Sequence, residues 1–135
     1  MKRIIAVVCM ISMLGILSAC SVQKLSTEKL HDLDFTVVKE EDIPKELGKM
    51  ISDHKEQVFK LTYADQGLLY IAEGYGKQPT SGYSIEVKDC FESKNAVYFH
   101  TNLIGPSKTE MIVEQPTYPY IVIKMNLVDK NVVFQ

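Results

Sequence analysis

Hydrophobic and polar residues alternate along much of the chain after residue 57. A period of two is typical of β-strands that bury one face. It occurs around residues 58–63, 83–88 and 97–103, and YIVIKMNLV at 120–128 predicts a further, long strand. A continuous apolar run at 68–72 lacks the alternation, and it predicts a central strand that is buried on both faces.

Three shorter segments complete the predicted strands. DFTVV at 34–38 is rich in β-branched residues, and MIV at 111–113 is a short apolar run. The last six residues, 130–135, are expected to fold back on the preceding strand as a tight hairpin through Asp129 and Lys130.

One segment has the period of an α-helix instead. Apolar residues recur at helical spacing over about 43–55. Asp42, with Glu40 and Glu41 beside it, suits the positive N-terminal end of this helix. Capping therefore explains the acidic cluster without a metal site or an acid/base site.

One helix and six or seven strands joined by short turns predict a mainly β domain. The expected architecture is a small antiparallel β-sandwich or a partly closed barrel, with the helix laid over one end. A single globular domain is expected over 34–135, because a chain of 135 residues is too short for two domains with separate cores.

The first twenty residues follow a different pattern. Lys2 and Arg3 precede an uncharged run at 4–17, which is shorter than the roughly 20 apolar residues of a membrane-spanning helix. A basic start, an apolar middle and small residues before a cleavage site describe an export signal.

The export signal ends in LSAC, at 17–20, which resembles the lipobox of bacterial lipoproteins. In that motif the cysteine becomes the first residue and carries acyl chains. We therefore expect a cleaved signal peptide at 1–19, lipidation of Cys20 and a polar tether at 20–33, with the domain held outside the cytoplasm at a membrane. The alternatives are an ordinary secretory signal cleaved after Ala19, or an uncleaved anchor.

Charge and chemistry narrow the function classes. The formal net charge is −2, and it becomes more negative when the basic signal is removed, so nucleic acid is not an expected partner. Cys90 is the one cysteine outside the signal and the lipobox, and we interpret it as structural. The three histidines lack the spacing of a metal site or of a dyad with a thiol, and no phosphate loop or nucleophile elbow is present. No enzyme activity, cofactor or metal is expected.

Two loops combine a stiff backbone with contact side chains. In GKQPTSGY, at 76–83, Pro79 fixes its own φ, Gly82 can take a positive φ, and the hydroxyl groups of the Thr-Ser pair can bond to nearby backbone. In QPTYPY, at 115–120, prolines stiffen the chain and tyrosines offer contact area. The same residues also suit ordinary turns, with their tyrosines filling the core.

The segment from Gly74 to about Met125 resembles the C-terminal domain of the PrcB family of bacterial protease-complex subunits. In that family a G-x-K-x-T-x-G-Y pattern leads into a strand, and a T-x-P-Y element opens a later one. The resemblance implies an accessory or stabilising subunit of an exported protease complex that is not itself catalytic. The residues that it implies for partner binding are Lys77, Pro79, Thr80, Gly82, Tyr83, Tyr118, Pro119 and Tyr120.

Two alternative functions stay open. PTSGY alone is similar to the NPTTGY loop of chagasin-type cysteine-protease inhibitors, which implies inhibition through the loop at 78–83. An envelope protein that binds a small ligand or a cell-wall sugar is the other alternative. It predicts a cavity lined by Tyr63, Tyr70, Tyr75 and Tyr98.

Overall fold

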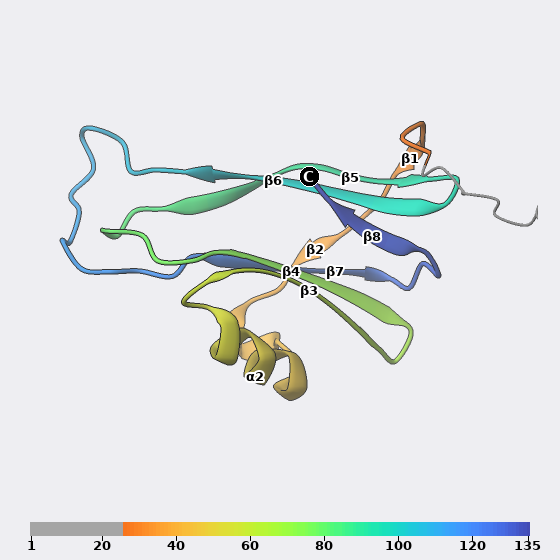
Figure 1. Ribbon diagram of the computed structural model, residues 1–135, viewed down its shortest axis with the longest axis horizontal. Helices are drawn as coiled ribbons and strands as arrows, with labels where there is room; N and C mark the ends of the chain where they lie inside the picture. The colour runs from red at the N-terminus through yellow and green to blue at the C-terminus, as the bar shows by residue number, and fades with distance from the viewer. Residues whose placement is uncertain (1–25) are drawn as a thin grey trace, which may run out of the picture.

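The computed structural model describes residues 26–135, which form eight β-strands, one α-helix and a short 3₁₀-helix (Figure 1). The signal peptide, Cys20 and the first part of the tether lie outside these residues. In chain order the elements are β1 Lys29–Asp32, β2 Thr36–Val37, η2 Glu40–Asp42, α2 Lys45–His54, β3 Val58–Asp65, β4 Leu68–Tyr75, β5 Ser84–Ser93, β6 Ala96–Ile104, β7 Tyr120–Asn126 and β8 Asn131–Phe134.

The strands form two four-stranded sheets that face each other. Sheet A has the order β1-β5-β6-β8, and sheet B has the order β2-β7-β4-β3. Helix α2 covers the face of sheet B that points away from sheet A (Figure 1). The predicted mainly β sandwich with one helix is therefore confirmed, and neither sheet closes into a barrel. Within 26–135, no helix is long and apolar enough to cross a membrane.

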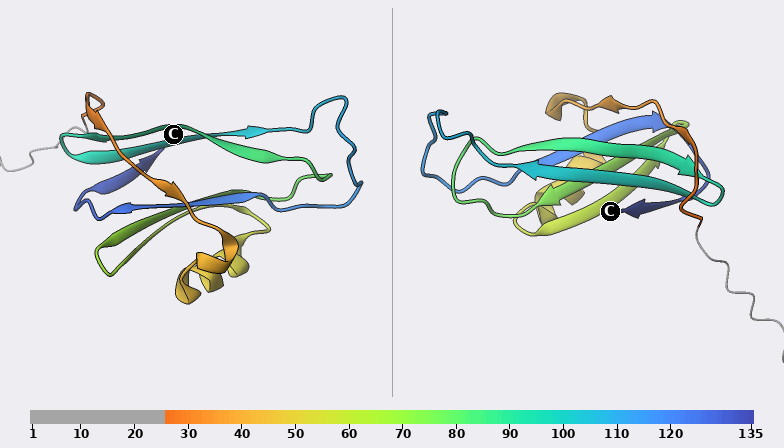
Figure 2. Two further views of the ribbon diagram at one scale, coloured as in Figure 1. Left: turned by 180° about the vertical axis from the view of Figure 1, so that it is seen from behind. Right: turned by 90° about the horizontal axis from the view of Figure 1, so that it is seen from above.

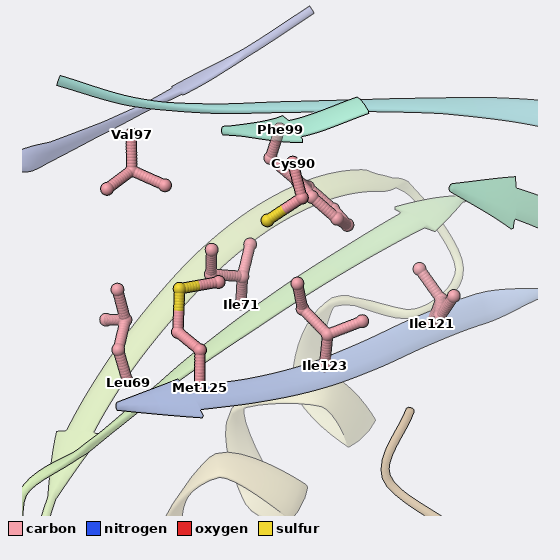
Figure 3. Close-up of a cluster of buried hydrophobic side chains, with 8 residues drawn as sticks. All are labelled: Leu69, Ile71, Cys90, Val97, Phe99, Ile121, Ile123 and Met125. Carbon is pink, nitrogen blue, oxygen red and sulfur yellow. The ribbon is translucent and has the colours of Figure 1, made fainter. Parts of the chain in front are cut away.

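The space between the sheets is filled by alternate residues of four strands (Figure 3). Leu69 and Ile71 of β4 point to this side, while Tyr70 and Ala72 point to α2. Strand β4 is thus buried on both faces, as its continuous apolar run predicts. The cluster between the sheets consists of Leu69, Ile71, Cys90, Val97, Phe99, Ile121, Ile123 and Met125.

A second apolar layer lies between sheet B and α2. Leu47 and Ile51, one helical turn apart, are buried on Tyr70, Ala72 and Val122 of the sheet. The helix is therefore held by one apolar stripe. Its predicted extent of about 43–55 is confirmed to within two residues.

The predicted N-cap of this helix is wrong. Asp42 ends the separate 3₁₀-helix η2 with Glu40 and Glu41, and Pro44 takes the N-cap position of α2 without a side-chain hydrogen bond. The fixed φ of proline suits a helix start, so no capping side chain is needed here.

The predicted tether, 20–33, is wrong in its last part. Strand β1 pairs antiparallel with residues 91–93 of β5. The Leu33 N–H donates to the Cys90 carbonyl at 2.9 Å, and the Leu33 side chain packs against the core between the sheets. The segment has a polar sequence because β1 is a short edge strand whose four residues are all exposed.

The predicted C-terminal hairpin is also wrong. Strand β8 does not return along β7 but crosses to sheet A and pairs parallel with β6. Lys130, in the connection, donates to the Glu92 carboxylate and to the Ser93 carbonyl, which holds this turn against the end of β5. The same ammonium group holds the pKa of Glu92 below its usual range. Phe134 then packs edge-on against Phe99.

The first two strands belong to different sheets, so the chain between them passes from sheet A to sheet B. In Figure 2 the segment from β1 to β2 runs as a strap from one sheet to the other. It covers the ends of β5 and β7 that lie away from the long loops. The edges of β5 and β7 nearer those loops are left without a neighbouring strand.

A buried carboxyl group links the two sheets. Glu73 of β4 is 5% exposed, and the Thr101 hydroxyl on β6 donates to its Oε2 at 2.9 Å. The Tyr75 hydroxyl lies 2.7 Å from the same Thr101 oxygen. Burial raises the pKa of Glu73, although the Thr101 hydrogen bond and the Lys60 charge act in the opposite direction.

The buried carboxyl group makes stability depend on pH. Below its ordinary pKa, near 4.5, Glu73 is protonated in both the folded and the unfolded state. As the pH rises through the raised pKa of the folded state, the fold must bury a charge, and the stability present at lower pH is lost. Glu73→Gln keeps an acceptor for Thr101 but cannot ionise. We expect its free energy of unfolding, measured in urea between about pH 4 and about pH 8, to exceed that of the wild type by an amount that grows with pH.

The control for this measurement is Glu86→Gln, on an exposed position of β5. This variant should follow the wild-type pH profile. Parallel profiles for Glu73→Gln and the wild type would show that Glu73 ionises at no cost to the fold.

Candidate functional site

The two loops selected from the sequence meet at one end of the sandwich. Residues 76–83 connect β4 to β5, and the long segment 105–119 connects β6 to β7. Figure 1 shows both at the end of the molecule opposite β1. The Gln78 N–H donates to the Thr117 carbonyl at 2.8 Å, and the Thr117 N–H donates back to Gln78 at 3.0 Å. The loops are therefore joined as a short antiparallel bridge.

Further hydrogen bonds join the loops on either side of this bridge. The Thr117 hydroxyl donates to the Thr80 carbonyl at 2.7 Å. Ser81 bonds twice to Val113, by its N–H to the carbonyl at 3.0 Å and by its hydroxyl, which accepts from the Val113 N–H at 2.8 Å. The expectation that hydroxyl residues bond to nearby backbone is confirmed, but the backbone belongs mostly to the other loop.

Two glycines shape the first loop. Gly76 has φ of +72°, and a Cβ there would lie 3.2 Å from the Val58 nitrogen. Gly82 has φ of +89°, and a Cβ there would lie 2.7 Å from Cβ of Pro106 in the second loop. Gly82 therefore combines a left-handed conformation with close packing between the loops.

The residues expected to bind a partner divide by exposure. Lys77 and Pro79 are exposed at the tip of the first loop. Tyr120 packs partly under α2, with its ring 6.3 Å from that of Phe59, so it serves the core as well as the surface. The remaining five, Thr80, Gly82, Tyr83, Tyr118 and Pro119, are half-buried.

An exposed apolar triplet belongs to the same end. Met111, Ile112 and Val113 are 95%, 43% and 59% exposed. Their segment is not the short strand expected from the MIV run, because Val113 is tied to Ser81 in an irregular loop. Three adjacent exposed apolar side chains are typical of a protein-contact surface. The sequence run was visible, but only the loop geometry shows that nothing within the described residues buries it.

A groove opens beside the second loop. It has a volume of about 350 Å³ and runs between the β2 end of the strap and the 118–120 segment. Val37 and Ile43 line one side, and Glu40 is its charged residue. A pocket of about 320 Å³ adjoins it under α2 and shares Glu40, Ile43 and Tyr120. The segment 118–120 therefore connects the bridged loops with a groove along the edge of sheet B.

The comparison with family models identifies this region. The PrcB C-terminal model matches residues 69–126. The match begins on β4, includes both loops and ends on β7. The segment at 69–126 belongs to the PrcB family. Searches among curated proteins and among solved structures gave no match.

The matched PrcB segment contains every partner-binding residue expected from the sequence, together with the exposed triplet. Membership of this family associates the chain with a subunit of a protease complex. The segment does not include β1, β2, β3 or β8, which are the edge strands of the two sheets, or α2, which covers one face of sheet B.

No group of three His, Cys, Asp or Glu residues within 26–135 has the geometry to hold a metal ion. Cys90 lies in the core, and burial raises the pKa of its thiol to about 11. The thiol is therefore protonated at neutral pH, which suits the structural role expected for it.

The cavity expected for a small ligand is not formed. Tyr63 and Tyr70 face α2, and the Tyr63 hydroxyl donates to Glu46 at 2.9 Å. Tyr75 bonds between the sheets, and Tyr98 stacks on Phe91 with ring centroids 5.0 Å apart. The four rings do not line one cavity, because Tyr63 and Tyr70 lie on the α2 side of sheet B, whereas Tyr75 and Tyr98 contact other layers.

The contact between the loops can be tested through Gly82. Gly82→Ala should lower the free energy of unfolding by more than about 2 kcal/mol, since the left-handed backbone costs about 1–2 kcal/mol and the added Cβ also meets Pro106. Gly67→Ala is the matched control, with φ of +76° and no atom within 4 Å of the added Cβ. Urea unfolding measures both. Equal losses for the two variants would contradict close packing between the loops.

Proposed function

We propose that this chain is a non-catalytic, lipid-anchored subunit outside the cytoplasm, and that it binds an exported protease complex through the loop end of the PrcB domain. The observation that carries the proposal is the bridge between Gln78 and Thr117. It turns two separate segments of the family pattern into one continuous surface. A surface with many internal hydrogen bonds has little conformational entropy to lose on binding.

The composition of this surface supports a protein partner. The first loop presents Lys77 and Pro79, and the second presents the apolar side chains of Met111 and Ile112 together with the half-exposed Tyr118. Exposed apolar and aromatic groups within a polar surround are typical of protein interfaces. The accessory role is implied by the family, and we propose the exposed loop end as the surface that carries it.

The position of the N-terminal segment supports an anchor at the opposite end. The Ser26 N–H donates to Oδ1 of Asn95 in the turn between β5 and β6, at 2.8 Å. The loop end lies at the other end of these strands (Figure 2). The residues from Cys20 to Ser26 span at most about 20 Å when extended. A lipid on Cys20 would therefore leave the loop end directed away from the membrane.

Protease inhibition is a second candidate. It is favoured by the exposed Pro79 on a loop whose backbone is held by hydrogen bonds to residues 113–117. Addition of the purified protein to papain-like proteases separates the two functions. An inhibitor slows peptide hydrolysis at micromolar concentration, whereas an accessory subunit leaves those enzymes unchanged.

Partner binding is tested by recovery from solubilised membranes. We expect the wild-type chain to recover a protease subunit, and the double variant Lys77→Glu, Met111→Asp to recover at least about fivefold less, because the two changes alter one exposed side chain on each of the bridged loops. Recovered proteins are quantified by mass spectrometry.

The matched control places the same changes at the other end of the sandwich. Lys94→Glu with Leu127→Asp alters one exposed lysine and one exposed apolar residue, and it should recover the partner like the wild type. Equal recovery by both double variants, with both folded, would remove the loop end as the binding surface. Recovery of no protease component by the wild type would contradict the accessory role.

Lipidation has its own measurement. Mass spectrometry of the membrane-extracted protein should find Cys20 as the first residue with acyl chains attached, and Cys20→Ser should abolish both the modification and the membrane association. Cys90→Ala, a change at the buried thiol, should keep the lipid. A mature chain that begins after Ala19 without acyl groups would instead indicate an ordinary secretory signal.

A further inference from the structure

The edge of sheet B beside the loop end carries backbone groups that have no strand partner within residues 26–135. The Tyr75 N–H donates to the Pro119 carbonyl at 3.1 Å, so these two residues form a hydrogen-bonded pair between β4 and β7. The next pair, Gly74 with Tyr120, must then be a non-hydrogen-bonded pair. The N–H and C=O groups of Tyr120 therefore point away from β4, toward the outer edge of β7.

Strand β2 does not reach these groups. It pairs Thr36 with Lys124 and Val37 with Ile123, and the Val38 N–H adds one bond to the Val122 carbonyl at 2.8 Å. Continuation of this register would place residue 40 opposite Tyr120. Glu40 instead begins the 3₁₀-helix η2, and the chain leaves the sheet. The edge of β7 is thus open from Tyr120 toward the loop end.

The open edge coincides with the groove described above. The groove lies in line with β2 and is lined by Val38, Ile43 and Tyr118 as well as by Tyr120. Tyr120, whose backbone N–H and C=O groups face outward, is one of the residues that line this volume of about 350 Å³. A backbone that enters this groove in the direction of β2 would run antiparallel to β7. It would pair with the groups that β2 leaves free.

We propose that this groove accepts a short extended segment of the partner protein, which adds to sheet B at the edge of β7. Strand addition supplies backbone hydrogen bonds, and the groove supplies contacts for alternate side chains. Apolar side chains of the segment face Val38 and Ile43. This inference rests on the proposed function in that the segment is assigned to the same protease complex.

Charge adds a requirement for the sequence of the segment. Glu40 is the charged side chain of the groove, and within 26–135 its carboxylate lies in no ion pair. The segment that fits therefore carries a lysine or an arginine at the position that faces Glu40, next to its alternating apolar residues. The other edge strand of sheet B, β3, is less suited to strand addition, because Lys60 points inward there beside the Phe134 ring.

The site is tested with the full-length chain in detergent and a displayed library of random peptides of about nine residues. We expect the enriched peptides to share alternating apolar residues and one basic residue. Synthetic copies should slow amide hydrogen exchange at Tyr120 by at least about tenfold. Copies with N-methylated backbone amides should bind at least about tenfold more weakly, because they cannot form the ladder.

Glu40→Lys and Glu41→Lys form the matched pair of variants, since both are exposed residues of η2 but only Glu40 lines the groove. Glu40→Lys should weaken the basic peptide by about fivefold or more, and Glu41→Lys by less than about twofold. A peptide with glutamate in place of its basic residue should recover affinity for Glu40→Lys.

Three results would overturn the inference. They are equal effects of the two lysine variants, binding that leaves the Tyr120 amide unprotected, and protection of Tyr120 by self-association without peptide.

These results are independent of the recovery experiment that tests the proposed function. Absence of any enriched peptide together with recovery of a protease subunit removes the groove and keeps the proposed function. Peptide binding without recovery of a protease removes the proposed function and keeps the groove.

Discussion

The antiparallel pairing of β4 with β7 is the contact on which the rest of the molecule depends. The two strands are separated by about half of the described chain, yet they pair without interruption from Leu68 with Asn126 to Gly74 with Tyr120. Both strands contribute to the apolar layer against sheet A and to the layer against α2. Burial on both faces makes this register costly to change, because a shift by one residue would exchange the two sets of side chains.

The register of these strands also determines where the two loops of the loop end begin. Since Gly74 and Tyr120 are opposite each other, the chain that leaves β4 and the chain that enters β7 begin side by side. The bridge between Gln78 and Thr117 resumes antiparallel pairing within the loops, one residue out of the β4–β7 register. The stiffness of the candidate binding surface is therefore an extension of the sheet. Proline and glycine adjust it locally.

Elements outside the family segment complete the fold in ways that matter for binding. Strand β2 pairs with only part of β7, and η2 then turns the chain away, which leaves both the groove and the outward backbone of Tyr120 open. Strand β8 extends sheet A beside β6, with its connecting turn held by Lys130. The buried bond between Glu73 and Thr101 joins the two sheets close to the start of the first loop. Loop end, groove and core are thus connected through β4 and β7.

The sequence alone determined the features that depend on neighbouring residues. A period of two located β3, β5 and β6, and apolar runs located β4 and β7, because burial on one or both faces determines which positions of a strand are apolar. The family pattern likewise lay in short segments, and the proline, glycine and tyrosine residues of both loops were recognisable from their types.

Only the tertiary structure decided which segments lie together. No local pattern distinguishes a return of β8 along β7 from its crossing to β6, since the same apolar residues can fill either position. The exposure of Met111, the pairing of Gln78 with Thr117 and the open edge at Tyr120 also depend on strands far apart in the chain. Periodicity reports the environment of each residue, whereas the choice of neighbour comes from packing two sheets and a helix around a common core.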